Sequence, residues 1–275
     1  MLATPQEEAP LGNARTRQQF KKRVQTHFSK AATSYDAAAL LQQRVAEHTH
    51  LLIPPSQVFS RILDVGSGTG YQTRQLRRRY PNANITGIDL AIGMAQYASA
   101  QTPCHHPIHW AVGDMECLPF QSDTFDLVYS SLAIQWGELS HVLQEIKRVL
   151  KPGGLFVFSS LLCGTMVELK TAWQQVDDES RMNRFKTLAE KQQVFEQLHM
   201  PLNHVHRRWE TLFYPSVRAM LGELKALGVN VAQSPARGLM TRHKLNALGN
   251  AYEVHRQPQG LPLSYEVVYG QVNTR

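Results

Sequence analysis

Residues 64–70, Asp-Val-Gly-Ser-Gly-Thr-Gly, have the composition and spacing of a ligand-binding turn. Glycine at every second position lets the backbone turn sharply between a short apolar run, typical of a buried strand, and a helical pattern over 71–80. A strand that ends in glycines and opens a helix is typical of a nucleotide-binding corner, because its backbone N–H groups are open to a ligand. We predict cofactor contacts from Asp64, Gly66, Ser67, Gly68 and Gly70.

The spacing of the glycines helps to distinguish a dinucleotide such as NAD from other cofactors. A dinucleotide fingerprint reads G-x-G-x-x-G, whereas here the third glycine comes one residue early and Tyr71 occupies the expected place. The carboxylate of Asp64 would repel a pyrophosphate and favours a ligand with a positively charged amino-acid part. The pattern therefore argues against NAD.

Acidic residues also follow the next two predicted strands. Asp89 ends the run 85–89, where an acid would accept hydrogen bonds from both ribose hydroxyls. Asp114 is suited to an adenine amino group, with Met115 against the ring. We assign three further residues near these strand ends to the cofactor site: Leu90, Met94 and Ser130.

The substrate side of the pocket is predicted at the end of the run 125–131. This strand should lie beside the glycine corner, so its carboxyl end is where substrate and cofactor would meet. Gln135 and Trp136 follow directly and are expected to project into the pocket, with the Trp136 ring as one wall. Glu116, unless paired, would repel an anionic substrate and is expected to point away.

Composition narrows the class of protein. The 275 residues, 43% of them hydrophobic, suffice for one large α/β domain with additions. No run of about 18 apolar residues occurs, and the N-terminus lacks the order of a signal peptide, so we expect a cytoplasmic protein. The three cysteines are scattered, and the Cys104-His105-His106 segment is a proline-flanked loop without acids at ligand spacing, so we expect no metal site.

The net charge of +7 suggests an acidic partner, for which nucleic acid and an acidic carrier protein are both candidates. A basic surface without any partner explains the charge equally well. The sequence contains no basic segment with interleaved aromatic residues, which is the pattern that would favour nucleic acid. Charge alone therefore does not choose between these interpretations.

Three motifs together resemble the S-adenosylmethionine-dependent methyltransferases with a Rossmann-like fold: residues 64–70, Asp89-Leu90 and Lys151-Pro152-Gly153-Gly154. Segments 28–36, 183–185 and 263–270 are similar to the malonyl-acyl-carrier-protein O-methyltransferases of biotin synthesis. The resemblance implies S-adenosyl-L-methionine as cofactor. It also implies the free carboxylate of a malonyl thioester as methyl acceptor and acyl carrier protein as partner.

The resemblance implies the following organisation. We expect a disordered tail over 1–14, a helical segment over 15–55 that closes over the site, and a methyltransferase domain over 56–275. The fold should be a Rossmann-like, doubly wound α/β sheet that is mostly parallel, with one antiparallel strand near the C-terminus. Helical cap inserts are expected at about 164–185 and 216–250, because these segments are too long for simple loops.

Two side chains are candidates to act on the substrate. Tyr35 lies in the segment that folds over the cofactor in the resembling family, and is either a residue that closes the site or a core aromatic. Arg184 has a guanidinium that matches a carboxylate, and a structural ion pair with Asp177, Asp178 or Glu179 is the equal alternative. No general base is needed for a carboxylate, since its pKa of about 4 leaves it ionised.

The second cap insert carries a basic cluster, which is the expected docking surface for an acidic carrier. Its members are Lys225, Arg237, Arg242, His243 and Lys244. The alternative is that they are ordinary surface cations. Other reactions stay open. A methyltransferase for another small carboxylic acid or a quinone precursor has the same cofactor site, although a quinone would require a base and no suitable histidine stands at a strand end. An RNA-binding protein or RNA methyltransferase is the alternative of another class.

Overall fold

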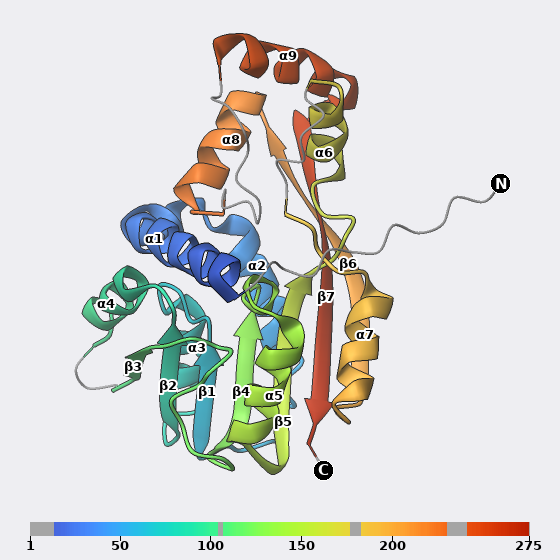
Figure 1. Cartoon of the computed structure of the whole chain (residues 1–275). Helices are drawn as coiled ribbons and strands as arrows, with labels where there is room; N and C mark the ends of the chain where they lie inside the picture. The colour runs from blue at the N-terminus through green and yellow to red at the C-terminus, as the bar shows by residue number, and fades with distance from the viewer. Residues whose placement is uncertain (1–13, 104–106, 177–182, 230–240, 275) are drawn as a thin grey trace, which may run out of the picture.

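The computed structural model describes residues 14–103, 107–176, 183–229 and 241–274 (Figure 1). Its sheet has the strand order β3-β2-β1-β4-β5-β7-β6. The strands are β1 (Arg61–Val65), β2 (Asn84–Asp89), β3 (His109–Val112), β4 (Phe125–Ser131), β5 (Leu150–Leu161), β6 (His204–Tyr214) and β7 (Leu261–Asn273).

Strands β1 to β5 pair in parallel, and β7 runs antiparallel to both of its neighbours, β5 and β6. The prediction of a mostly parallel Rossmann-like sheet with one antiparallel strand near the C-terminus is therefore confirmed. The order reverses between β1 and β4, so the carboxyl ends of these two strands border the crevice in which such sheets bind their ligands.

The helices, in chain order, are α1 (Ala14–Ala38), α2 (Leu40–Leu51), α3 (Tyr71–Arg79), α4 (Ile92–Ala100), α5 (Leu139–Val149), α6 (Val167–Gln174), α7 (Leu188–Gln197), α8 (Val217–Ala226) and α9 (Arg242–Tyr252), with 3-10 turns η1 (Ile134–Trp136) and η2 (Glu253–His255). None of these described helices is long and apolar enough to cross a membrane.

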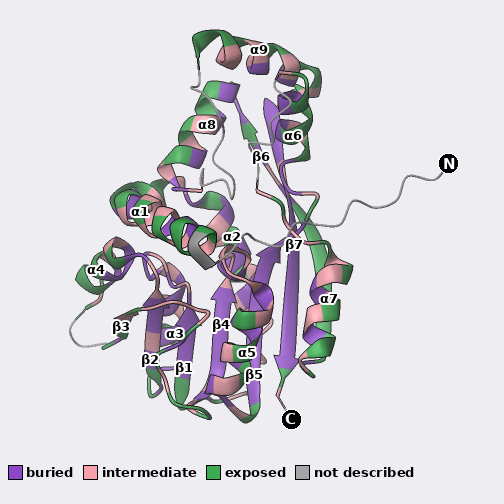
Figure 2. Cartoon of the chain, viewed as in Figure 1, coloured by how far each residue is buried: buried purple, intermediate pink, exposed green. Residues whose placement is uncertain are grey.

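Two apolar clusters, one on each face, bury the central sheet (Figure 2). Leu63 and Val128 pack on one face with side chains of α5 and α7, such as Ile146 and Phe195. Ile62 packs on the other face with residues that include Leu76 of α3. Because both faces are covered, the strands are nearly continuous apolar runs, and polar side chains gather at the strand ends.

A third cluster lies where β6 and β7 extend beyond the other strands and carry α6, α8 and α9 (Figure 1). Leu169, Met220 and Leu248, one from each of these helices, are buried there against β7. These helices fall in the segments predicted as cap inserts. Arg237 of the predicted basic cluster lies outside the described residues.

Ser29 and Ser34 could each cap or break a helix, but both lie inside α1. Helix α1 runs through both serines, and the chain bends only at Ala39. The hydroxyl of Ser34 donates to the Ala31 carbonyl, and that of Ser29 accepts from the Gly93 N–H of α4, so neither competes with the helix backbone. Helix α1 can therefore lie as one rod over the carboxyl ends of the strands (Figure 1).

In the first cap insert, expected at about 164–185, helix α6 begins only at Val167. The Gly164 N–H donates to the Glu266 carboxylate at 2.8 Å, and the Met166 N–H donates to the Ser264 carbonyl at 2.6 Å. These bonds to β7 hold residues 164–166 in a turn, so the helix cannot start earlier.

Candidate active site

The glycine turn adopts a backbone that other residues avoid. Gly66, Gly68 and Gly70 have φ values of 72°, 54° and 79°, in the left-handed region that favours glycine. A Cβ on Gly66 would lie 2.2 Å from the Cβ of Ala133, whereas one on Gly68 would meet nothing within 4 Å. The turn therefore packs closely against the loop after β4 at one glycine and faces open space at the next.

That open space is part of a cavity between the carboxyl ends of the strands and helix α1. It encloses about 780 Å³ including open solvent at its mouth, within the range of roughly 300–1,000 Å³ of small-molecule sites. Nine of the predicted site residues line it: Tyr35, Gly66, Gly68, Asp89, Leu90, Met94, Asp114, Met115 and Trp136. Six predicted residues lie outside this lining: Asp64, Ser67, Gly70, Ser130, Gln135 and Arg184.

Asp89 stands at the end of β2 with its carboxylate held from two sides. The N–H groups of Gly68 and Ala91 donate to its two oxygens at 2.9 and 2.8 Å. Burial raises the pKa of Asp89, and the two backbone hydrogen bonds oppose this rise. The carboxylate is thus fixed beside the glycine turn, and its remaining lone pairs are suited to hydroxyl donors such as those of a ribose.

Asp64 and Ser130 support the turn from behind. Asp64 is 2% exposed and accepts a 2.6 Å hydrogen bond from the hydroxyl of Thr73. Burial raises its pKa to about 7, and the nearby Asp89 carboxylate acts in the same direction. The Ser130 hydroxyl donates to the Val65 carbonyl at 2.9 Å and ties β4 to β1.

Ser67 has a buried hydroxyl that finds no hydrogen-bond partner in the described part of the chain. A buried polar group without a partner costs free energy, but this hydroxyl lies outside the cavity lining and faces Gly87 of β2, so it gives no evidence for a ligand contact. To a bound ligand, the cavity offers the bare backbone of the glycine turn, two nearby carboxylates, and the apolar side chains of Leu90 and Met115. These residues fit S-adenosylmethionine, which is cationic and carries a ribose and an adenine.

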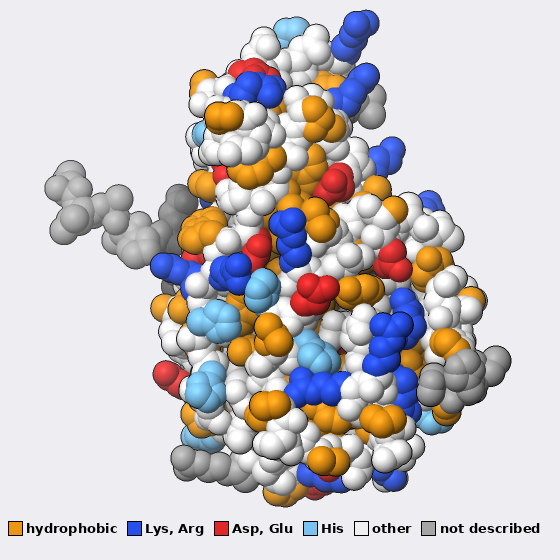
Figure 3. Space-filling model, turned by 180° about the vertical axis from the view of Figure 1, so that it is seen from behind, with side chains coloured by type: hydrophobic (Ala, Val, Ile, Leu, Met, Phe, Trp, Pro, Cys, Tyr) orange, Lys and Arg blue, Asp and Glu red, His pale blue; other side chains and the backbone are white. Residues whose placement is uncertain are grey.

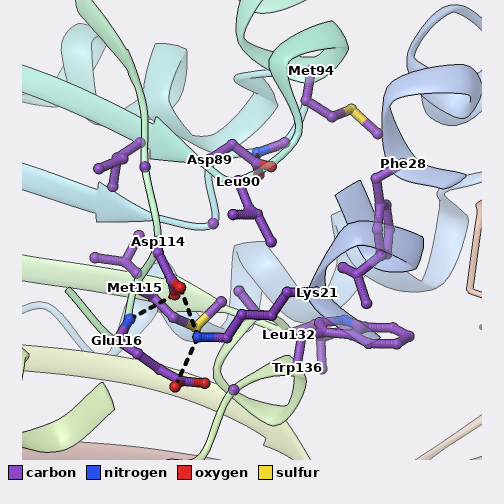
Figure 4. A pocket seen from close by; sticks show the side chains of 18 of the residues that line it. Lys21, Phe28, Asp89, Leu90, Met94, Asp114, Met115, Glu116, Leu132 and Trp136 are labelled. Atoms are coloured by element: carbon purple, nitrogen blue, oxygen red, sulfur yellow. Dashed lines mark hydrogen bonds and ion pairs between the residues drawn. The ribbon is translucent and has the colours of Figure 1, made fainter. Parts of the chain in front are cut away.

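Lys21 of α1 lines the cavity beside Asp114 and Glu116 (Figure 4). Its ammonium lies 2.6 Å from Asp114 and 2.8 Å from Glu116. Burial lowers the pKa of Lys21, but the two carboxylates outweigh this effect and the net shift is upward, so the side chain stays charged. Sequence reasoning missed this residue, because the Lys21-Lys22-Arg23 run is typical of an exposed helix face.

Glu116 lines the cavity and is paired with Lys21, although it was expected to point away unless paired. Its other oxygen accepts the Glu138 N–H at 2.9 Å. Asp114 accepts the Glu116 N–H through Oδ1 at 2.9 Å. The second oxygen of Asp114 contacts Lys21, and it retains a lone pair for an amino donor.

Aromatic side chains form the wall opposite the glycines. The Phe28 ring packs edge-on against Trp136 at 5.3 Å, and the Phe20 ring stacks on Trp136 at 6.4 Å. Tyr35 lies 6.3 Å from Phe28, and burial together with Asp89 raises its pKa, so its hydroxyl remains a donor. Helix α1 thus supplies an apolar cover that excludes water.

Gln135 and Arg184 lie apart from the cavity. The Gln135 amide donates to the Leu132 carbonyl at 2.6 Å and accepts from Ser160 at 3.2 Å. Arg184 is 69% exposed and lies 3.8 Å from Glu190. The acids Asp177, Asp178 and Glu179, considered as its partners, lie outside the described residues.

Known relatives resemble the chain over nearly its whole length. A family described as a methyltransferase domain matches residues 63–158. The malonyl-[acyl-carrier protein] O-methyltransferase of Serratia marcescens is 39% identical over 254 residues, which cover 92% of this chain and 95% of that protein. That of Halorhodospira halophila is 38% identical, with coverages of 90% and 85%.

The biotin biosynthesis bifunctional protein BioHC of Cellvibrio japonicus is 43% identical over 251 residues. The match covers 90% of this chain and 49% of BioHC, so the chain spans about half the length of that relative.

Solved structures share the fold. A methyltransferase of Bacillus halodurans has a TM-score of 0.60 at 15% identity, with 83% of this chain and 97% of that chain covered. Geranyl diphosphate C-methyltransferase from Streptomyces coelicolor, solved with S-adenosyl-L-homocysteine, has a TM-score of 0.53 at 13% identity, with 85% and 76% covered. The methyltransferase domain and the relatives that cover most of both chains, together with the lining of the cavity, identify S-adenosylmethionine as the cofactor, and the chain belongs to the malonyl-[acyl-carrier protein] O-methyltransferase family.

Proposed function

We propose that this protein methylates the free carboxylate of a malonyl group carried as a thioester on acyl carrier protein, as a step of biotin synthesis. The observation that carries the methyl-transfer part is the cavity at the glycine turn, where Gly68 holds the carboxylate of Asp89 and faces open space. The substrate follows from the names of relatives that cover most of both chains.

S-adenosylmethionine, when bound, supplies a methyl group on a positively charged sulfur. A carboxylate oxygen forms the new bond to this carbon while the bond from carbon to sulfur breaks, and its electron pair stays on the sulfur. No proton is transferred, and no histidine is among the residues that line the described cavity.

The residues of this chain contribute orientation and exclusion of water. Phe28, Tyr35 and Trp136 cover the cavity, and the fixed carboxylate of Asp89 aligns the donor. Proximity and orientation of this kind supply up to roughly 7–11 kcal/mol of a two-substrate barrier. Arg184 remains a candidate for the substrate clamp, with its guanidinium at the surface near Glu190.

The reaction is tested by mixing purified protein, methyl-labelled donor and malonyl, succinyl or acetyl thioesters of the carrier. Label should appear on malonyl and not on acetyl thioester, because only the former has a free carboxylate. Label on a quinone precursor or on RNA, with none on any thioester, would contradict the proposal in favour of the alternative methyltransferases.

We further infer that the acidic carrier docks on the basic cap. Lys225 and Arg242 are exposed on α8 and α9, and Figure 3 shows Lys and Arg side chains projecting from the end of the molecule that carries these helices. The C-terminal end of α8 contacts α1, since the Ser34 hydroxyl of α1 lies 3.3 Å from the Ala226 carbonyl. A carrier bound there would be close to the helix that covers the cavity.

Reversal of Lys225 and Arg242 to Glu should raise KM for the malonyl carrier far more than KM for a small malonyl thioester. The matched control reverses Arg61 and Arg78, two exposed cations outside the cap. Equal changes for both substrates, or equal changes in the control, would remove the docking surface from the proposal.

A further inference from the structure

A buried lysine lies behind the wall of the cavity and has no role in the reaction described above. Lys191 of α7 is 4% exposed, and its ammonium donates to the Ser160 hydroxyl of β5 at 3.0 Å. In the described ranges of the chain it forms no ion pair. A charged group is costly to bury, so a lysine retained here requires an explanation.

Hydrogen bonds link this lysine to the cavity. The Ser160 hydroxyl lies 3.2 Å from the side-chain oxygen of Gln135, and the Gln135 amide nitrogen donates to the Leu132 carbonyl at 2.6 Å. Leu132 lines the cavity directly after β4, and its φ of 49° is strained for a residue with a branched side chain. The chain of bonds therefore ends on a strained turn of the cavity wall.

The charge of Lys191 sets the direction of these bonds. An ammonium only donates, so Ser160 must accept from Lys191 and give its own proton to Gln135. The Gln135 oxygen is then the acceptor, and its NH₂ group must face Leu132. A neutral lysine could instead accept from Ser160, which would remove this constraint.

The electrostatics of the cavity require a cation on this side. Among the described residues that line the cavity, Asp89, Asp114 and Glu116 carry carboxylates, and Lys21 is the one lysine or arginine. This excess of negative charge suits the cationic donor and repels a carboxylate acceptor. Lys21 is occupied by two carboxylates, whereas Lys191 contacts only a neutral hydroxyl.

We propose that Lys191 is a positioning residue for the methyl acceptor. Through Ser160 and Gln135 it holds the Leu132 turn in its strained form, and its positive charge attracts the acceptor carboxylate to that side of the cavity. The role rests on the proposed function, because it requires an anionic acceptor.

The proposal predicts a pH dependence of substrate binding. Burial lowers the pKa of Lys191 to about 8, Lys186 acts in the same direction, and Glu190 on the same helix opposes it. On α5, which packs against α7, Lys147 donates to the Leu198 carbonyl at 2.7 Å. The malonyl carboxylate stays ionised above a pH of about 5. At saturating donor, KM for a malonyl thioester should therefore rise as the pH rises from 7 to 9.

The test compares Lys191→Met with Lys170→Met, which removes an exposed cation from α6. At pH 7, Lys191→Met should raise KM for a small malonyl thioester about tenfold, because the variant loses both the constraint on the Leu132 turn and the attraction of the acceptor carboxylate. The rise in KM between pH 7 and 9 should be absent in this variant. Donor affinity should not change. Lys170→Met should behave as the wild type.

Stability separates this role from a structural one. Because the folded-state pKa of Lys191 is depressed, its charge destabilises the fold at pH values below about 8, and this cost disappears as the pH approaches 10.5. Lys191→Met should therefore raise the Tm at pH 7 while it weakens substrate binding. An unchanged KM at pH 7 would overturn the proposal.

Ser160→Ala gives a second test, which does not depend on the folding of the lysine variant. It should raise KM by itself, and the double variant should be no worse than the more severe single variant, because both changes interrupt one chain of bonds. Additive effects would overturn the relay. If the wild type transfers no methyl group to a malonyl thioester, the proposed function fails and this role falls with it.

Discussion

At the scale of single residues, the site depends on carboxylates whose positions are fixed by backbone N–H groups. Asp89 is held by Gly68 and Ala91, and Asp114 by the N–H of Glu116. Such groups need no rearrangement when the ligand arrives, so little of the binding free energy is lost in ordering side chains.

Replacing Asp89 by Ala should lower donor affinity by about a hundredfold, because two hydrogen bonds to a charged group are lost. Calorimetric titration with S-adenosylhomocysteine measures the effect. Asp126→Ala is a suitable control, since Asp126 is a half-buried carboxylate on β4 that pairs with Lys151 and lies outside the cavity lining. Unchanged affinity in the Asp89 variant would refute the ribose assignment.

Donor binding should also release protons near pH 7. Burial raises the pKa of Asp64 to about 7, so part of this carboxyl is protonated in the free protein at neutral pH. A cationic donor favours the charged form, which lowers the pKa and expels the proton. Donor affinity should therefore rise as the pH increases from about 6 to about 8.

Calorimetry in two buffers of different ionisation heat measures this release, and Asp64→Asn should abolish it. Proton release of the same size in the Asn variant would assign the effect to another group.

At the scale of elements, helix α1 converts an open strand edge into a covered cavity. It is attached at both ends of the site, through Lys21 at Asp114 and Glu116 and through Ser29 at Gly93 of α4. A Cβ on Gly93 would lie 2.5 Å from the Ser29 carbonyl oxygen, so the two helices approach closely only because this residue is glycine. Helix α1 therefore borders the mouth through which the donor reaches the cavity.

Lys21→Met should accelerate donor dissociation about fivefold, the effect of one partly exposed ion pair worth roughly 1 kcal/mol. Stopped-flow tryptophan fluorescence would follow this step, since Trp136 forms part of the cavity wall. Lys22→Met, at the next and exposed position of the same helix, should leave the rate unchanged. Equal rates in all three proteins would show that the ion pair does not retain the donor.

At the scale of the whole molecule, charge has two separate distributions. Three of the four charged side chains among the described residues that line the cavity are acidic, which suits a cationic donor, whereas the chain as a whole carries a net charge of +7. The basic excess therefore lies outside the cavity lining, where it can attract an acidic partner without repelling the donor.

The salt dependence of KM should distinguish the exposed basic charges from the acidic charges of the cavity. Because the Debye length is about 10 Å at 0.1 M salt, raising the salt concentration screens exposed charges far more than buried ones. KM for the malonyl carrier should increase several-fold between about 0.05 and 0.3 M salt. KM for a small malonyl thioester should change little, and parallel increases would argue against electrostatic docking of the carrier.

The sequence by itself predicted the sheet and nine of the residues that line the cavity. Gly66 and Gly68, and the acids that follow the strands, are local signals, because a strand end and a turn depend on neighbouring residues. Parallel strands place their carboxyl ends at one edge, so Asp89 and Asp114 could be brought together without coordinates.

Only the tertiary structure determined which side chains cover the site or support it from behind. Lys21 and Lys191 have no local signal, since their partners are 93 and 31 residues away in the chain. Gln135, which was expected in the pocket, bonds the neighbouring Leu132 and also Ser160, a partner 25 residues away on β5. Long-range packing orients these side chains, and the spacing of residues along one segment carries no information about the segment packed against it.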